Sequence, residues 1–225
     1  MKAFDRWNEE MYVKHGNLNR IRSANPFIKW FTNQRAKTIS EMIDINPSDS
    51  LLDLGCGAGF ITKRILDDLY PRECNVLNTS DNTTLVDLSE TALHEAREVL
   101  KHYSGIVYVH SNAETYKSDN KFNAIVCTEV LEHTQHPDKV IDVIASTADK
   151  DTCIIISVPN EKLTNAIKKS AFGLLGKPLD DWHIHEFDKE KIINLTKNKF
   201  KLIDEKAIPN KKMPLTYILK FKLRE

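Results

Sequence analysis

Three observations predict an α/β protein with a doubly wound, mostly parallel sheet. Short apolar segments alternate with segments of helical periodicity along most of the 225 residues. Some apolar segments have no polar face, as in strands that are covered on both sides. Alternate glycines, Gly55, Gly57 and Gly59, follow the first of these strand-like segments. Together these features indicate a parallel sheet with helices packed on both faces.

The N-terminal part of the chain, residues 1–46, is expected to be a helical segment. Apolar residues recur there at roughly helical spacing over residues 27–43. The pair Asn46-Pro47 is expected to end the helix, because the residue before a proline disfavours the helical conformation. The remainder of the chain then alternates between strands and helices.

Strands are expected at residues 51–55, 83–89, 105–111, 122–130, 152–160, 200–208 and 215–223. Helices are expected at residues 60–70, 89–100, 137–147 and 188–198. Ser89 suits an N-cap, and Pro137 suits the first turn of a helix. The polar stretch 71–84 is longer than usual and is interpreted as a surface excursion. In such sheets ligands bind at the carboxyl ends of the strands, near the point where the strand order reverses.

Composition limits the class of protein. The 32 basic and 32 acidic residues give a formal net charge of zero, which does not favour a nucleic-acid partner but does not exclude one. No C-x-x-C pair occurs, so the cysteines are interpreted as free thiols of a reducing compartment. No signal core or apolar run of membrane-spanning length is present. The sequence therefore predicts a cytoplasmic protein without a transmembrane segment.

The glycine loop fits a phosphate site poorly. A dinucleotide fingerprint needs a glycine where Phe60 stands, and a P-loop needs a terminal G-K-[ST] that is missing. Asp87 ends the second expected strand, where a carboxylate can accept hydrogen bonds from two ribose hydroxyls. Asn112 follows the third strand and carries both a donor and an acceptor for an adenine edge. These signals together predict an adenosine site without phosphates.

These residues resemble the motifs of class I S-adenosylmethionine-dependent methyltransferases over about residues 30–225. The resemblance implies a Rossmann-like, seven-stranded sheet in a single methyltransferase domain, residues 1–225, with S-adenosylmethionine as cofactor. It implies that Gly55 and Gly57 pack against the methionyl part of the cofactor. The full set of cofactor-binding residues that it implies is Arg35, Asp53, Gly55, Gly57, Gly59, Asp87, Leu88, Asn112, Ala113 and Thr128.

The segment CTEVLEHTQHP, residues 127–137, resembles the EVLEH segment of the ubiquinone-biosynthesis O-methyltransferases. In that alignment Thr128 falls where a residue lines the cofactor. Arg35 falls where those enzymes place an arginine, whose guanidinium could pair with the methionine carboxylate. A solvated arginine on a helix is the alternative interpretation of Arg35.

Glu129, Glu132 and His133 are candidate metal ligands. On a helical turn, positions i, i+3 and i+4 share one face, so these side chains would converge and could bind Mg²⁺ or Mn²⁺. The set resembles the metal site of some ubiquinone-pathway methyltransferases and of small-RNA 3′-terminal 2′-O-methyltransferases. The alternative is that Glu132 and His133 are solvated or hydrogen-bonded locally.

Residues 161–185 form an insertion after the fifth strand and are expected to act as a lid over the acceptor. His183 and His185 share one face if this segment is extended. With His133 they are the candidate catalytic residues, and either could act as a general base or complete a metal site. An ordinary loop histidine is the alternative for both.

The predicted function is S-adenosylmethionine-dependent O-methylation of a small-molecule acceptor. Two alternatives stay open: a metal-dependent RNA 2′-O-methyltransferase, and a non-catalytic module that binds the cofactor or a partner chain. The sequence names neither the acceptor nor the oligomeric state.

Overall fold

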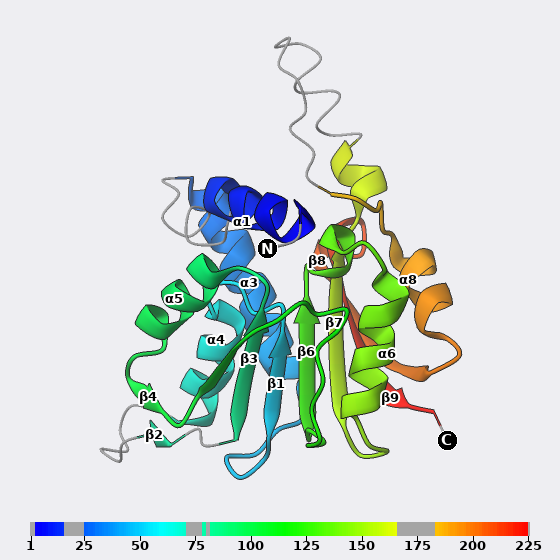
Figure 1. Ribbon diagram of the computed structural model, residues 1–225. Coiled ribbons are helices and arrows are strands. Elements are labelled where there is room, and N and C mark those ends of the chain that lie inside the picture. Colours follow the sequence, from blue (N-terminus) through cyan, green and yellow to red (C-terminus); the bar gives the residue numbers. More distant parts are fainter. Residues whose placement is uncertain (1–2, 16–24, 71–77, 80–81, 166–182, 225) are drawn as a thin grey trace.

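The computed structural model describes residues 3–15, 25–70, 78–79, 82–165 and 183–224. At its centre lies a seven-stranded sheet with the strand order β5-β3-β1-β6-β7-β9-β8. Its strands are β1 Leu51–Leu54, β3 Thr83–Asp87, β5 Val107–His110, β6 Ala124–Thr128, β7 Cys153–Pro159, β8 Phe200–Asn210 and β9 Met213–Leu223. Strands β5, β3, β1, β6 and β7 are parallel, whereas β9 is antiparallel to β7 and β8. The predicted doubly wound, mostly parallel sheet is therefore confirmed (Figure 1).

The described helices are α1 Ala3–His15, α3 Pro26–Met42, α4 Phe60–Leu69, α5 Glu90–Val99, α6 Pro137–Thr147 and α8 Lys189–Thr196, with a short 3₁₀ helix, η1, at Leu131–His133. Helix α6 begins and ends where the sequence predicts. Helix α3 ends at Met42, before the Asn46-Pro47 pair that was expected to end it. Its C-cap, Ile43, is already extended (φ −77°, ψ 126°) and enters the connection to β1.

Strand β1 shows how the two faces of the sheet are covered. Leu52 and Leu54 enter a core that includes side chains of α6 and α8. Leu51 enters the opposite core, which includes side chains of α3 and α4. Each fully buried side chain of this kind contributes about 1.5–3 kcal/mol through removal from water. The two cores hold the carboxyl ends of the strands as a rigid edge.

Two features were not predicted. A two-stranded parallel sheet pairs β2, Asn78–Thr79, with β4, Tyr103–Ser104. Each strand has two residues, too few for a recognisable pattern. In addition, helix α1 packs beside α5: Tyr12 donates a hydrogen bond of 2.7 Å to Glu95. Figure 1 shows α1 lying beyond the carboxyl ends of the parallel strands.

In the described part of the chain, Cys56, Cys127 and Cys153 are buried free thiols, as the sequence predicts. Cys74 lies outside the described residues. None of the described helices has the length and apolar character that a membrane crossing requires.

Candidate active site

The glycine loop joins β1 to α4 at the centre of the sheet, where β3 and β6 flank β1 on either side. Gly55, Gly57 and Gly59 all have positive φ, at +81°, +52° and +73°. The backbone N–H groups of Gly55 and Cys56 both donate to the carbonyl of Val86, at 2.7 and 3.0 Å. The turn is therefore anchored to β3, and it needs glycine because other residues rarely adopt these angles.

Two of the glycines also serve the packing of the fold. A Cβ atom on Gly55 would lie 2.3 Å from Cγ2 of Val130, in the connection after β6. A Cβ on Gly59 would lie 3.0 Å from Cδ1 of Leu100, at the end of α5. The lack of a side chain at Gly55 and Gly59 thus has a structural reason within the protein.

We expect Gly55→Ala to lower the free energy of unfolding by about 2–5 kcal/mol, from backbone strain and overpacking together. Val130→Ala in the same chain should recover part of this loss, because it removes the clash but leaves the strained φ. Urea unfolding of the two single variants and the double variant measures the coupling. Equal stability of Gly55→Ala and wild type would contradict the close approach to Val130.

Asp87 ends β3 and holds the loop beside it. Its Oδ2 accepts a hydrogen bond of 2.8 Å from the N–H of Gly57, and its Oδ1 accepts one of 2.8 Å from the N–H of Ser89. Burial raises the pKa of Asp87, and these two N–H groups oppose the rise. A carboxylate offers about four lone-pair sites, so each oxygen can still accept one donor from a ligand. The carbonyl oxygen of the adjacent Leu88 lies 2.9 Å from Nε2 of His110.

Asp53 lies one strand away and is almost fully buried. Thr62 donates a hydrogen bond of 2.6 Å to Oδ2, while Oδ1 has no partner among the described residues. Burial raises the pKa of Asp53 to about 7, the Thr62 hydroxyl lowers it and the nearby Asp87 raises it further. A buried carboxyl oxygen without a donor is costly, which marks this position as one that a ligand can complete.

This raised pKa predicts a pH-dependent stability. The folded state keeps the proton of Asp53 up to about pH 7, whereas the unfolded chain loses it near pH 4, so wild-type stability falls across that window by about 2–4 kcal/mol. Asp53→Asn carries no titrating group and should show a smaller fall between pH 4 and pH 7. Urea unfolding at several pH values, with the exposed Asp142→Asn as control, measures both slopes. Identical slopes in wild type and Asp53→Asn would overturn the assignment.

Asn112 and Ala113 follow β5 at the same edge of the sheet. The Oδ1 of Asn112 accepts a hydrogen bond of 2.8 Å from the N–H of Glu114, and Ala113 packs against the core. Glu114 in turn accepts a hydrogen bond of 2.6 Å from the N–H of Gln135. The loop after β5 is thereby joined to the loop after η1. Thr128, also predicted at the site, is buried at the end of β6.

Arg35 and Glu129 form a buried ion pair, with Nη1 and Oε2 3.1 Å apart. The Nε of Arg35 has no partner among the described residues. Glu129 has a φ of +55°, and its N–H donates to the carbonyl of Ser157. The expected helical face shared by Glu129, Glu132 and His133 is therefore wrong, because Glu129 precedes η1 and has a left-handed backbone.

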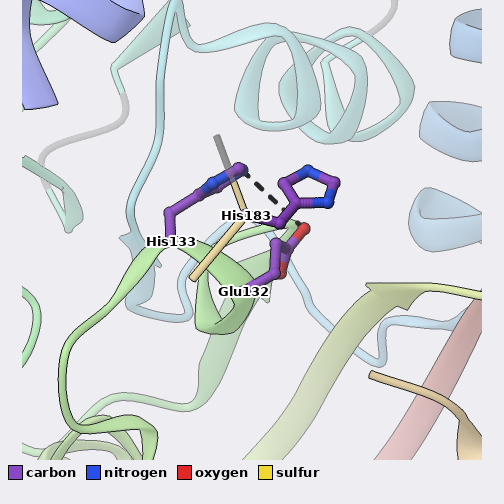
Figure 2. A group of neighbouring side chains, drawn as sticks. All are labelled: Glu132, His133 and His183. Atoms are coloured by element: carbon purple, nitrogen blue, oxygen red, sulfur yellow. Dashed lines mark ion pairs between the residues drawn. The ribbon is translucent and has the colours of Figure 1, made fainter. Parts of the chain in front are cut away.

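Glu132, His133 and His183 come together instead. One potential ligand atom from each lies within 4.8 Å of the others (Figure 2). His133 and His183 face each other with ring centroids 4.7 Å apart. Both carboxyl oxygens of Glu132 are buried without a hydrogen-bond partner among the described residues. Burial raises the pKa of Glu132, and the neighbouring Glu129 and Glu161 raise it further.

Glu161 joins this cluster and was not predicted. It lies two residues after the end of β7, is almost fully buried, and forms an ion pair with Nδ1 of His183. The signal that could have revealed it is its position, since an acidic residue just after the fifth strand lies at the ligand edge of the sheet. His185 lies outside the cluster: its Nε2 is 3.4 Å from the carbonyl of Gln135. Most of the expected lid, residues 166–182, lies outside the described residues.

A family model described as a methyltransferase domain matches residues 28–201. The chain belongs to this methyltransferase domain family. The methyltransferase is 24% identical over 202 residues to the mitochondrial ubiquinone biosynthesis O-methyltransferase of Dictyostelium discoideum, with 84% of this chain and 61% of that protein covered. It is 23% identical over 165 residues to the ubiquinone biosynthesis O-methyltransferase of Rickettsia canadensis, with 71% and 62% covered. It thus spans about three fifths of the length of these relatives.

Solved structures agree on the fold of the methyltransferase. The N-methyltransferase NodS of Bradyrhizobium japonicum, solved with S-adenosyl-l-homocysteine, matches with a TM-score of 0.69 at 15% identity over 99% of this chain and 100% of that one. Magnesium protoporphyrin IX methyltransferase of Synechocystis, with the same ligand, matches with a TM-score of 0.67 at 17% identity over 99% and 100%. The protein therefore has the class I S-adenosylmethionine-dependent methyltransferase fold.

Proposed function

We propose that this chain is an enzyme that transfers a methyl group from S-adenosylmethionine to a hydroxyl of a small molecule. The observation that carries the proposal is the Asp87 carboxylate, which is locked against the glycine loop by Gly57 and Ser89 while it retains acceptor capacity. Membership of the methyltransferase domain family supports the reaction class. The low-identity relatives named as ubiquinone biosynthesis O-methyltransferases support oxygen as the acceptor atom.

The residues present fit the cofactor. The carboxylate of Asp87 would accept hydrogen bonds from the two ribose hydroxyls. Asn112 and Ala113 would flank the adenine. The glycine turn at Gly57 would pass close to the methionyl part. Arg35 has an Nε–H group without a partner among the described residues, which suits the methionine carboxylate.

The sulfonium of S-adenosylmethionine, when bound, supplies an electrophilic methyl group. The protein contributes chiefly by holding the acceptor in line and by excluding water, which the buried edge of the sheet allows. His133 and His183 lie close together, and one of them would take the proton of the acceptor hydroxyl if no cation occupied their cluster. A positioned base contributes about 10²–10⁴-fold to such a step.

We propose that the cluster of Glu132, His133 and His183 holds a divalent cation. The two buried oxygens of Glu132 without donors fit a cation better than they fit an apolar surrounding. Of the two expected cations, a set of one carboxylate and two imidazoles suits Mn²⁺ better than Mg²⁺, because imidazole nitrogen prefers transition metals. A bound cation would lower the pKa of the acceptor hydroxyl and orient it. Glu129, the other predicted ligand, uses its Oε2 to pair with Arg35 in this structure.

Direct measurements test the proposed function. Calorimetry of the wild-type chain with S-adenosylhomocysteine should give saturable binding, and transfer of labelled methyl should follow with hydroxylated small molecules. Transfer to the 3′ end of a short RNA, weakened steeply by salt, would instead support the RNA alternative, because phosphate contacts release counterions. Cofactor binding without transfer to any acceptor would support the non-catalytic module.

A further inference from the structure

Glu161 and His183 form a buried pair that the proposed cation site does not yet explain. Glu161 is 2% exposed. Its Oε1 forms an ion pair with Nδ1 of His183, and neither carboxyl oxygen has a hydrogen-bond donor among the described residues. A buried carboxylate is stabilised only by the groups that it contacts, and here that group is His183. The contact therefore acts on His183 and on whatever His183 holds.

The backbone of Glu161 is held firmly by its surroundings. Its N–H donates to the carbonyl of Phe187 at 3.2 Å, and the N–H of the preceding Asn160 donates to Leu215 at 2.9 Å. The side-chain amide of Asn160 also donates to the carbonyl of Pro214, at 2.8 Å. Glu161 is thus held by Phe187 through its own N–H, and by the start of β9 through the neighbouring Asn160.

His183 is held from the other side by η1. The N–H of Ile184 donates to the carbonyl of Glu132 at 2.7 Å, so the residue after His183 is tied to the residue that supplies the buried carboxylate. The imidazole of His183 lies between Glu161 and the ring of His133. Figure 2 shows the side chains of His133 and His183 converging above Glu132.

We infer that Glu161 is a positioning residue that fixes the tautomer of His183. Its carboxylate accepts a hydrogen bond from Nδ1–H, which keeps the proton on Nδ1, so that Nε2 of His183 is unprotonated and serves as a ligand of the cation held with Glu132 and His133. A histidine that binds a metal commonly donates its other ring N–H to a carboxylate, which orients the ring and increases its basicity. This inference rests on the proposed cation site.

The charges of the cluster agree with this role. Arg35 compensates Glu129 through their ion pair. With a divalent cation bound, the carboxylates of Glu132 and Glu161 would supply two negative charges that balance it. Glu161 supplies one of those charges without having to touch the cation.

Two measurements test the inference, and neither needs methyl transfer. The first is Mn²⁺ binding to the purified chain, followed by the electron paramagnetic resonance signal of free Mn²⁺. Glu161→Ala should weaken the affinity by about 10–100-fold, and Glu161→Gln, which keeps the shape but loses the charge, should fall between it and wild type. The exposed Glu186→Gln is the matched control and should bind Mn²⁺ as wild type does.

The second measurement is the tautomer of His183, read from nitrogen-15 chemical shifts without metal. Wild type should carry the proton on Nδ1, and Glu161→Ala should move the population toward Nε2. An Nε2-protonated His183 in wild type, or unchanged Mn²⁺ affinity in folded Glu161→Ala, would overturn the inference. Binding of S-adenosylhomocysteine separates the proposed function from the role of Glu161. If the chain does not bind S-adenosylhomocysteine but binds Mn²⁺ as described, the proposed function is wrong and the role of Glu161 stands.

Discussion

Asp87→Ala is expected to weaken the binding of S-adenosylhomocysteine by about 100-fold or more. The variant removes two charge-assisted hydrogen bonds to the ribose, each worth about 1.5–3 kcal/mol, and every 1.4 kcal/mol corresponds to about tenfold in affinity. It also frees the N–H of Gly57, which Asp87 holds at 2.8 Å, so the glycine turn loses one of its supports. Isothermal calorimetry on the folded variant measures the loss.

Two further variants separate recognition from folding. Asp87→Asn keeps an acceptor for one backbone N–H and should fold, yet its neutral amide cannot accept both hydroxyls as a carboxylate does. Asp142→Ala removes an exposed carboxylate of α6 that pairs with Lys199, and its affinity should equal that of wild type. Unchanged affinity in natively folded Asp87→Ala would show that the carboxyl end of β3 does not bind the cofactor.

The strand ends that line the site could be predicted because they follow from local rules. The glycines of residues 55–59 come after an apolar segment, and Asp87 and Asn112 close the next two strands. Parallel strands bring such ends to one edge of a sheet whatever the lengths of the connections. The same logic predicted α6, since a proline opens its first turn and its apolar periodicity ends where the helix ends.

The pairs within the site could not be predicted because they join distant residues. Arg35 on α3 meets Glu129, the residue after β6, only in the folded chain, a contact that the spacing of neither residue indicates. The interpretation of E-x-x-E-H as one helical face assumed regular geometry. The positive φ of Glu129 breaks that geometry, and His183 takes the place that Glu129 was expected to fill. Sequence patterns describe periodicity, whereas this cluster depends on a local exception to it.

The burial of Glu132 indicates a function because it is unfavourable for the fold. A buried carboxyl group with no donor costs stability that an apolar side chain would not cost, and natural proteins tolerate such positions mainly at functional sites. Glu132 carries this cost at the ligand edge of the sheet, and the nearby Glu161, which pairs with His183, adds to it. A cation between them and the histidines would offset it.

Glu132→Gln is therefore expected to lower methyl transfer and Mn²⁺ affinity by about 100-fold or more, a larger effect than the loss of an outer carboxylate partner. The amide keeps the shape of the side chain but cannot supply the negative oxygen that a hard cation prefers. The affinity for S-adenosylhomocysteine should change little, because Glu132 is not among the residues proposed to hold the cofactor. Excess chelator should lower wild-type activity, and added Mn²⁺ or Mg²⁺ should restore it.

The same variant should fold at least as stably as wild type without metal, because it removes a buried carboxyl group that has no hydrogen-bond partner among the described residues and lies beside two other acidic side chains. A loss of activity together with an equal or higher free energy of unfolding distinguishes a cation ligand from a structural residue, which would lose both. Glu186→Gln, in the exposed part of the same region, should leave activity, Mn²⁺ affinity and stability unchanged. Full wild-type activity in excess chelator, with Glu132→Gln equally active, would leave the cluster as a wall of the pocket that holds no metal.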